Sequence, residues 1–488
     1  MPQRTSVFSK LVKDSPTEPA MTVQTTAVLL DVVNIMTDQK ASACIVVDDD
    51  GKPLGILTER DITRRIVFRM EETAPVTDVM SSPVLCLHED EYLYYAIARM
   101  RRRGLRHMPV VDASSKVTGS LSLAKTMALA SSQLMDEIDQ LTREDSVQGQ
   151  LEIKQSQVSL ADHLFNENIP TPEIQGLLTR INNDIYRRVV NLNLRAMEEE
   201  GYGPPPVGFC VIVMGSGGRG ENYLYPDQDN GFILENYPDE KHTEVDAWFI
   251  ELAERMTLDL DAVGLPLCKG YVMATNPLWR KTLSQWKQQV DIWNKRPDST
   301  KLRLCDIFFD FRTVWGETDM ADELRLHVTK TAGRNPAFLR AMYEDDQDHG
   351  TALGWFGRFI TVKKEDDVDF EGYLNLKHTG TLPLVEAMRL LVLREGIVEI
   401  NTLDRMTALQ RKGVLDDDEY DYLSGAFAHI SKLLFRQQVE DFKQRKRVTY
   451  YIHPDSLTER EKDILVDSLK AIDQLRNRIR SEFTGDIF

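Results

Sequence analysis

The chain has 488 residues, of which 42% are apolar and 28% charged, and this composition predicts a globular protein of about three domains. Its formal charge of −18 makes nucleic acid an unlikely partner, because such binding normally depends on Lys and Arg that neutralise phosphates. No apolar stretch reaches the roughly 20 residues that a membrane helix needs, and the N-terminus lacks the apolar core of a secretory signal. We therefore expect a cytoplasmic protein with no membrane partner.

The cysteines are odd in number and widely separated. Most of them lie in apolar runs, and no two have the spacing of a metal site. This pattern predicts reduced core residues, which are Cys44, Cys86, Cys210, Cys268 and Cys305.

The first 130 residues contain an internal repeat with an offset of 64 residues. Residues 44–48 match residues 108–112, and residues 55–58 match residues 119–122. Each copy is expected to form a strand, a helix, two paired strands and a further helix. The expected first helices and paired strands are residues 27–38, 45–47 and 54–57 in one copy, and residues 91–103, 109–111 and 117–121 in the other.

Two such copies, over about residues 10–130, resemble a tandem pair of cystathionine-beta-synthase-like (CBS) domains. In that family a Ser/Thr-x-x-Asp motif places its Asp on an adenosine ribose and its hydroxyl near phosphate. Thr58 and Asp61 match it in the first copy, whereas the second copy keeps Ser122 but has Lys125 in place of Asp. The resemblance implies AMP or ATP as a regulatory ligand of these residues, and a homodimer. The residues alone fit a helix N-cap at Thr58 equally well.

Residues 131–200 predict a helical linker, which Pro170 and Pro172 divide into two helices. Residues 134, 138 and 141 in its first part, and five apolar residues between 177 and 189 in its second, recur at helical spacing and indicate amphipathic faces. The Gly- and Pro-rich residues 201–206 mark a domain boundary.

Residues 207–235 are the most informative part of the chain. An apolar run at 207–214 predicts a buried strand, and Gly215 and Ser216 follow in a turn that can offer N–H groups and a hydroxyl to phosphate. A second strand should carry Asp227 and Asp229, whose side chains would point the same way. Two converging carboxylates favour a cation between them, and Mg²⁺ prefers such oxygen ligands. The arrangement suits metal-assisted attack on a nucleotide phosphate.

Residues 302–312 predict a further strand, with Asp306 and Asp310 on one face. A carboxylate buried there is costly unless it is paired or metal-bound, so one of the two is a candidate third metal ligand. The alternative is a salt bridge to Arg312 or another cation.

The rest of the chain is predicted to be mainly helical. One helix is expected over residues 243–263, followed by a loop and short strand over residues 264–274. Another helix should contain Trp279, Trp286 and Trp293, whose seven-residue spacing indicates a packing face. Residues 335–488 are expected to form helices, one of which begins near Pro383.

The strand, the Gly-Ser turn and the Asp-x-Asp pair together resemble the nucleotidyltransferase superfamily typified by DNA polymerase beta. The Gly-Ser-x-x-Arg-x-Glu pattern is most similar to the catalytic domain of the uridylyltransferase that modifies nitrogen-regulatory protein PII. The order of domains is similar to that of bacterial signal-transduction nucleotidyltransferases with tandem CBS domains. The resemblance implies Mg²⁺ or Mn²⁺ as cofactor and an NTP as substrate. The implied catalytic and metal residues are Asp227, Asp229 and Asp310, and the implied nucleotide-binding residues are Gly215, Ser216, Arg219, Glu221 and Lys269.

One departure from the family pattern is Pro226, which stands where Ser or Thr usually precedes the first Asp. We expect a multidomain α/β and α protein: a CBS pair (10–130), a helical linker (131–200), an α+β nucleotidyltransferase-like domain with a mixed sheet (201–332) and a helical C-terminal domain (333–488). The expected activity is nucleotidyl transfer to a protein or small-molecule hydroxyl, controlled by an adenine nucleotide. The alternative is a catalytically inactive nucleotide-sensing scaffold. A nucleic-acid polymerase or tRNA-end enzyme is disfavoured by the charge.

Overall fold

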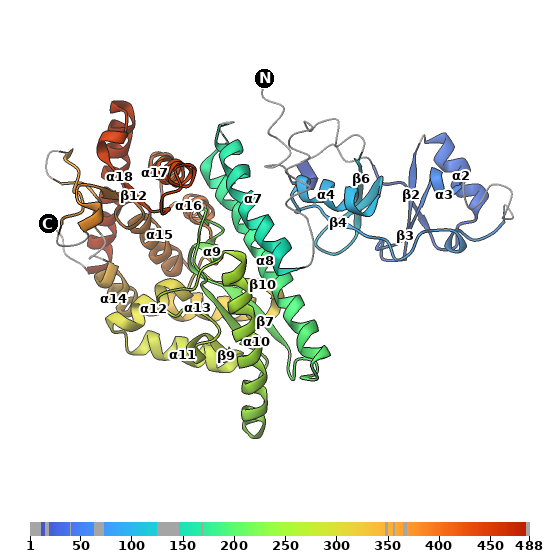
Figure 1. Ribbon diagram of the computed structural model, residues 1–488, viewed down its shortest axis with the longest axis horizontal. Helices are drawn as coiled ribbons and strands as arrows, with labels where there is room; N and C mark the ends of the chain where they lie inside the picture. The colour runs from blue at the N-terminus through green and yellow to red at the C-terminus, as the bar shows by residue number, and fades with distance from the viewer. Residues whose placement is uncertain are drawn as a thin grey trace. The chain divides into compact units, whose positions relative to one another are not determined.

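The chain divides into two compact units, Met1–Arg143 and Glu144–Phe488, in a computed structural model (Figure 1). Among the residues that the structure describes, no helix is both long and apolar enough to cross a bilayer. The described residues are 11–14, 19–39, 41–62, 73–123, 146–166, 169–346, 350–354, 357–364 and 368–484.

The first unit contains two copies of one small sheet, which confirms the repeat. In each copy a short strand pairs in parallel with a central strand, which pairs in antiparallel fashion with the next strand. The strands are β1 (Thr22–Gln24), β2 (Ala43–Val47) and β3 (Pro53–Thr58), then β4 (Leu87–His88), β5 (His107–Val111) and β6 (Val117–Ser122). The helices and helical turns are η1 (Val12–Asp14), α2 (Leu29–Asp38), α3 (Glu59–Asp61), η3 (Val76–Asp78) and α4 (Leu93–Arg103).

The helices α2 and α4 occupy the predicted positions but begin two residues later than expected. Val28 has extended backbone angles, so α2 can begin only at Leu29. The apolar face of α2 packs on the central strand of its own copy, where Val32, Met36 and Cys44 are buried together. Lys125 and the apolar residues 134, 138 and 141 lie outside the described residues.

The second unit is built around a mixed four-stranded sheet with the order β10-β7-β8-β9. Its strands are β7 (Phe209–Val213), β8 (Asn230–Leu234), β9 (Arg280–Thr282) and β10 (Arg312–Gly316). β7 pairs with β8 and β10 in antiparallel fashion, and β8 pairs with β9 in parallel. Every residue of β7 and β8 is buried, as the apolar run of residues 207–214 predicts for β7.

Residues 144–200, expected to belong to a linker, lie in this second unit. Here α7 (Val147–Asn166) and α8 (Thr171–Glu199) run side by side (Figure 1). Pro170 and Pro172 stand at the start of α8, as predicted. The expected apolar face of α8 is buried, and α8 packs against β10 and against α10 (His242–Val263), which follows η4 (Asp239–Lys241).

The prediction of a strand over residues 302–312 is wrong. Residues Ser299–Phe308 form α12, a turn follows at Phe309 and Asp310, and the strand β10 begins only at Arg312. Asp298 caps α12 by accepting a hydrogen bond from the Lys301 N–H at 3.0 Å. Leu302, Cys305 and Phe308 then form a buried face at helical spacing. The alternation of polar and apolar residues that suggested a strand was therefore misleading.

The segment between α10 and α12 differs from the prediction in two places. Trp279 lies in η5 (Pro277–Trp279), ahead of α11 (Leu283–Lys295), which holds Trp286 and Trp293. All three indoles are buried, so the predicted packing face is confirmed. Residues 264–274 form no strand, whereas β9 was not predicted.

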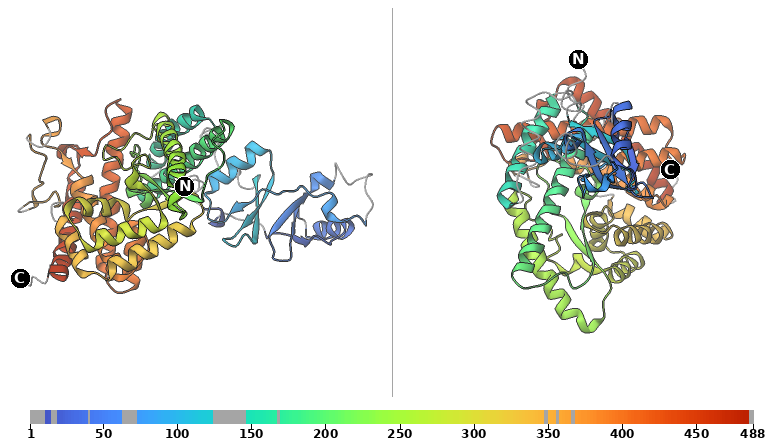
Figure 2. Two further views of the ribbon diagram at one scale, coloured as in Figure 1. Left: turned by 90° about the horizontal axis from the view of Figure 1, so that it is seen from below. Right: turned by 90° about the vertical axis from the view of Figure 1, so that its right-hand side faces the viewer.

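The C-terminal part is mostly helical, as expected, and its helices gather together in the second unit (orange to red, Figure 2). α15 is buried on almost every side, and Pro383 stands in its first turn as predicted. The elements after β10 are α13 (Asp319–Gly333), α14 (Pro336–Asp346), η7 (Val368–Phe370), β11 (Leu374–Asn375), η8 (Lys377–Thr381), α15 (Leu382–Glu395), α16 (Thr402–Arg411), α17 (Asp417–Lys443), β12 (Tyr451–Ile452), η9 (Pro454–Ser456) and α18 (Glu459–Thr484).

Candidate active site

The Gly-Ser turn after β7 forms α9 (Gly215–Arg219), a helical turn of 5 residues. At two positions of this turn only glycine fits, because other parts of the chain lie too close for a side chain. Gly215 has φ +58°, and a Cβ there would lie 3.2 Å from Asp229 Oδ2. A Cβ on Gly218 would lie 1.6 Å from the backbone oxygen of Asp310, which is impossible without movement of the chain. The turn is thus wedged between Asp229 and the segment that leads into β10.

The two acids lie in the extended segment just before β8, not inside a strand as predicted. Successive side chains of this extended segment still point in alternate directions. Gln228, between them, is buried and donates to the backbone oxygens of Leu265 at 2.8 Å and Thr257 at 3.0 Å. Asp227 and Asp229 point the other way, and their carboxylate oxygens lie within 4.8 Å of each other. The predicted convergence of the two carboxylates is confirmed.

A small cavity of about 20 Å³ joins the acidic pair to α9. Asp227, Asp229, Ser216 and Gly217 all line it. The Ser216 hydroxyl donates to Asn222 Oδ1 at 3.3 Å, which orients it at the cavity. A space of this size admits an ion or a water molecule, so a nucleotide would have to lie along the open side, where Asp227 is exposed.

The electrostatics of the acidic pair favour a bound cation. Burial, and then the negative charge of Asp227, raise the pKa of Asp229 to about 7. The positive charge of Lys377 acts in the opposite direction, which brings a residue of the C-terminal helices close to the site. The Lys377 ammonium lies over the Tyr450 ring, 4.1 Å from its centroid. A divalent cation between the carboxylates would relieve their repulsion more completely.

Cys268 is a third member of this group that the sequence did not reveal. Its sulfur lies within 4.8 Å of a carboxylate oxygen of each acid, although it is 40 residues from them in sequence. The side chain is buried, and burial followed by the charge of Asp229 raises the pKa of its thiol to about 12. All five cysteines are free thiols, as expected. Lys269 follows on an exposed turn of the same loop.

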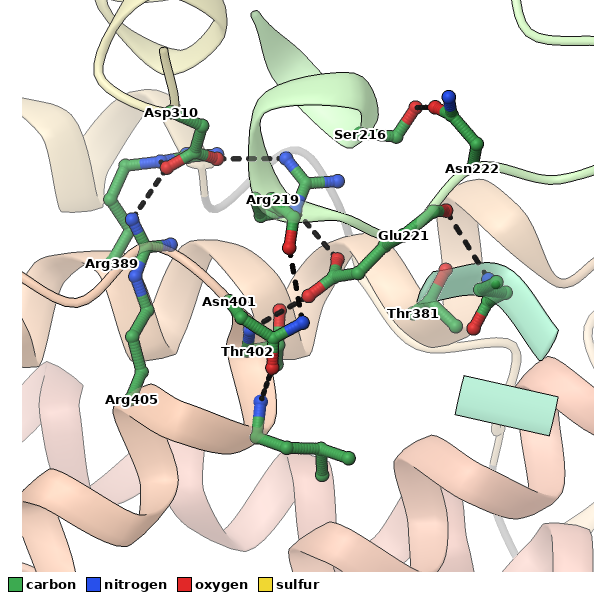
Figure 3. Close-up of polar contacts among 12 residues, drawn as sticks. Ser216, Arg219, Glu221, Asn222, Asp310, Thr381, Arg389, Asn401, Thr402 and Arg405 are labelled. Atoms are coloured by element: carbon green, nitrogen blue, oxygen red, sulfur yellow. Dashed lines mark hydrogen bonds and ion pairs between the residues drawn. The ribbon is translucent and has the colours of Figure 1, made fainter. Parts of the chain in front are cut away.

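Asp310 occupies a different place from the one predicted (Figure 3). It is fully buried, and its carboxylate binds Arg219 at 2.7 Å, Arg389 at 2.7 Å and Arg405 at 2.6 Å. Burial alone would raise the pKa of Asp310, but these guanidinium groups hold it well below its usual range. Asp310 lies outside the residues that line the cavity, so its prediction as a catalytic and metal-binding residue is not supported.

Arg219 and Glu221 are likewise not among the residues that line the cavity. Figure 3 shows their polar contacts. They bind each other at 2.7 Å, and Glu221 Oε1 accepts a hydrogen bond from the Thr402 N–H at 2.7 Å. Asn401 donates to the Arg219 backbone oxygen at 3.0 Å. In the structure these two residues contact each other and the start of α16, and their contact with a nucleotide stays a prediction.

We call Arg219, Glu221, Asp310, Arg389 and Arg405 the arginine network. It joins α9 to α15 and α16, which lie far along the chain. Because Arg389 lies on the buried part of a mostly apolar helix, its charge was a sequence signal for a carboxylate partner.

Arg389 also binds an acidic residue outside this network, Asp306, at 2.9 Å. Asp306, Asp346 and Glu386 form a second group whose carboxylate oxygens lie within 4.8 Å of one another. Burial raises the pKa of Asp306 to about 7, although Arg389 opposes it. Asp306 is thus anchored to Arg389 on α15 and lies apart from Asp227 and Asp229.

In the first unit, Thr58 and Asp61 form a helix cap. The Thr58 N–H donates to Asp61 Oδ2 at 3.0 Å, and the Thr58 hydroxyl caps the Asp61 N–H. Both residues also line a cavity of about 420 Å³, together with Ser42, Arg106 and His107 from the two repeats. The cap and a ligand-binding role are therefore compatible. Ser122 is buried in β6, opposite His107, outside the residues that line this cavity.

Comparison with known proteins finds family matches in three regions of the chain. Residues 155–300 match the family described as "Putative nucleotidyltransferase DUF294", and residues 336–483 match the "Putative nucleotidyltransferase substrate binding domain". Residues 12–68 and 76–125 match the CBS domain. The chain thus combines a CBS pair with the two regions of a nucleotidyltransferase-type protein.

Individual relatives cover about a quarter of the chain. The uncharacterized protein MK0525 of Methanopyrus kandleri is 28% identical over 115 residues, which are 23% of this chain and 54% of that protein. Among solved structures, the CBS domain pair of protein MJ0100 with 5′-methylthioadenosine and S-adenosyl-L-methionine is 25% identical, with a TM-score of 0.23, and covers 25% of this chain and 94% of that one. The CBS domain protein PAE2072 of Pyrobaculum aerophilum, complexed with AMP, is 21% identical, with a TM-score of 0.24, and covers 26% of this chain and 98% of that one. The chain spans only about half the length of the curated relative.

Proposed function

We propose that the second unit is a metal-dependent nucleotidyltransferase. The observation that carries the proposal is the convergence of Asp227 and Asp229 at a cavity that α9 also lines. The match of residues 155–300 to a nucleotidyltransferase family supports it. Asp227 and Asp229 would hold Mg²⁺ or Mn²⁺, which neutralises phosphate charge and lowers the pKa of an incoming hydroxyl.

The remaining groups would bind and orient the triphosphate. Backbone N–H groups at the start of α9 have no partner within the helical turn, so Gly215, Ser216 and Gly217 can donate to phosphate oxygens. Lys377 adds positive charge near the acidic pair, and Lys269 would add more from the loop that carries Cys268. In the reaction the acceptor oxygen bonds to the α-phosphorus, the bond to the β-phosphate breaks, pyrophosphate leaves, and the hydroxyl proton passes to solvent.

The acceptor would be a hydroxyl of a protein or a small molecule, as in uridylyl transfer to a signalling protein. Assays with each of the four NTPs, labelled at the α-phosphate, would identify the nucleobase. We expect Asp227→Asn combined with Asp229→Asn to abolish transfer while the fold, followed by circular dichroism, stays intact. Nucleotide binding without any turnover by the wild-type protein would instead favour a catalytically inactive nucleotide sensor.

The first unit would regulate this activity as an adenine-nucleotide sensor. The cavity of about 420 Å³ at Thr58 and Asp61 is large enough for a nucleoside, and Asp61, which lines it, would accept hydrogen bonds from ribose. Control requires that AMP or ATP bind two states of the protein with different affinity. If AMP saturates the first unit and leaves the transfer rate unchanged, this regulatory role is excluded.

We further propose a homodimer formed through the CBS pair, in a bacterial signal-transduction protein. Sedimentation equilibrium of the full chain tests the dimer directly. A chain that remains monomeric at micromolar concentration, with and without AMP, would rule it out.

A further inference from the structure

We propose that Cys268 is a ligand of the metal held by Asp227 and Asp229, so that the site also takes thiophilic divalent ions such as Cd²⁺ and Zn²⁺. This inference rests on the proposed function only in taking the two acids as metal ligands. The Cys268 sulfur and a carboxylate oxygen of each acid lie within 4.8 Å of one another, although the cysteine belongs to a different segment of the chain from the two acids. Asp310, the third ligand that the sequence suggested, is instead occupied by arginines.

The position of Cys268 is fixed by bonds on both sides of it. Two residues that precede the cysteine accept hydrogen bonds from Gln228. The Gln228 N–H donates to the Pro266 backbone oxygen at 2.8 Å, and the Gln228 side chain donates to the Leu265 backbone oxygen. After it, the Asn230 N–H donates to the Val272 backbone oxygen at 3.0 Å. The Asn230 side chain accepts from the Ala274 N–H at 2.9 Å. The residues on either side of Asp229 therefore tie the loop down, which holds the cysteine opposite the carboxylate.

The donor set of two carboxylates and one sulfur determines which ions fit. Carboxylate oxygens serve Mg²⁺, Mn²⁺ and Zn²⁺, whereas a thiolate selects softer ions and contributes little to Mg²⁺. Bonds of about 2.3 Å to sulfur and about 2.1 Å to oxygen would place the three donor atoms about 3.5 Å apart, so they need little movement from separations that are all within 4.8 Å. A thiophilic ion such as Cd²⁺ would displace the thiol proton, which passes to solvent, and leave a thiolate on the metal, whereas Mn²⁺ would leave the thiol protonated.

A thiol that only donates a hydrogen bond to Asp229 is the competing explanation. It predicts no sulfur–metal bond, so a spectroscopic measurement separates the two cases. Cd²⁺ bound to a thiolate gives an ultraviolet charge-transfer absorption that Cd²⁺ bound to carboxylates lacks. The absorption does not depend on catalysis, so it is informative whether or not the protein transfers nucleotides.

The test is a titration of the full chain with Cd²⁺, followed by this absorption. We expect the signal to saturate at one equivalent, to disappear in Cys268→Ser, and to weaken in Asp229→Asn. Cys86→Ser is the matched control, because Cys86 is a half-buried thiol of the first unit, and it should keep the signal. The Cd²⁺ affinity should fall about tenfold or more in Cys268→Ser, relative to the Mn²⁺ affinity.

Three outcomes would overturn the inference. They are a signal that survives Cys268→Ser, Cd²⁺ binding without the absorption, and a wild-type signal that excess Zn²⁺ does not suppress. The last test needs no variant, so it decides the matter even if Cys268→Ser does not fold. A Cd²⁺ signal in a protein that transfers no nucleotide would refute the proposed function alone. Transfer with Mn²⁺ but no cadmium–sulfur signal would refute the role of Cys268 alone.

Discussion

The Asp229 carboxyl exchanges its proton near neutral pH, and a bound metal ion would favour the deprotonated form. Burial and the neighbouring Asp227 raise the pKa of its carboxyl to about 7, against 3.8 for an ordinary aspartate. The folded protein therefore binds a proton that the unfolded chain releases above pH 3.8. Without metal, this group makes the fold less stable as pH rises from about 4 to about 7. A bound cation removes that cost because it replaces the proton.

The affinity of the full chain for Mn²⁺ should accordingly depend on pH. Below about pH 7 the ion competes with a proton on Asp229, so affinity should fall about tenfold for each pH unit and level off above pH 7. Asp227→Asn removes the negative neighbour, which should move the midpoint of the remaining dependence to lower pH. Isothermal titration calorimetry at several pH values measures both. An affinity that stays flat between about pH 5 and pH 7 would contradict this account.

At the scale of elements, α9 is the junction between the sheet and the C-terminal helices. Its backbone touches the Asp310 segment at Gly218, and Arg219 carries the contact on to α15 and α16 through Asp310. The turn that would hold phosphate thus depends on helices far along the chain. This gives the arginine network a structural role in positioning the turn.

Glycine substitutions in α9 test the close approach. Gly218→Ala should destabilise the fold by more than about 2 kcal/mol, because the new methyl group would overlap the Asp310 backbone. Gly217→Ala is a matched control in the same turn, since its methyl group would meet neighbours at 3.7 Å, an ordinary contact. Chemical denaturation measures both variants. Equal stability of the two would show that the turn is not wedged as described.

The arginine network should respond to loss of its central carboxylate. Asp310→Asn leaves three buried guanidinium groups without their shared anion, and we expect a loss of about 3–5 kcal/mol. Glu200→Gln, which breaks an exposed pair with Arg255, should cost about 1 kcal/mol or less. Thermal unfolding compares the two.

The pH dependence gives a second check on Asp310. Its pKa is lowered on folding, so its contribution is complete above about pH 4 and is lost only as pH falls through the still lower folded value. The difference in stability between wild type and Asp310→Asn should therefore stay constant from about pH 5 to about pH 8. A difference that disappears within that range would show that another group controls the network.

Patterns with a short period could be predicted from the sequence, whereas contacts between distant segments could not. The repeat, the buried strand β7 and the converging pair Asp227 and Asp229 depend on local periodicity and were found. The sequence of α12 fits the apolar spacing of a strand and also that of a helix. Asp298, which can cap a helix at that point, is the residue that distinguishes the two. Arg405 lies 95 residues from Asp310, so only the folded chain could reveal that pair.

At the scale of the whole molecule, the chain combines two units with separate cavities. The first unit presents Thr58 and Asp61 at one cavity, and the second presents the acidic pair at another. Because the two cavities belong to different units, the proposed sensing site and the proposed reactive site can be altered independently.

Asp61→Asn tests that independence. The amide keeps an oxygen that can accept the Thr58 N–H bond but loses the charge and one acceptor, so AMP should bind about tenfold more weakly or worse. Asp78→Asn, an exposed acid of the same unit, should leave AMP binding unchanged. Mn²⁺ affinity should be the same in both variants. Unchanged AMP binding in Asp61→Asn would place the adenine nucleotide elsewhere.

The claim that two acids clamp a cation beside α9 is tested most directly by a crystal structure of the full chain with Mn²⁺ and a non-hydrolysable NTP. We predict an anomalous peak between Asp227 and Asp229, with phosphate oxygens against the backbone of residues 215–217. An anomalous peak confined to the Asp306, Asp346 and Glu386 group, or a nucleotide bound with no metal at the acidic pair, would contradict it.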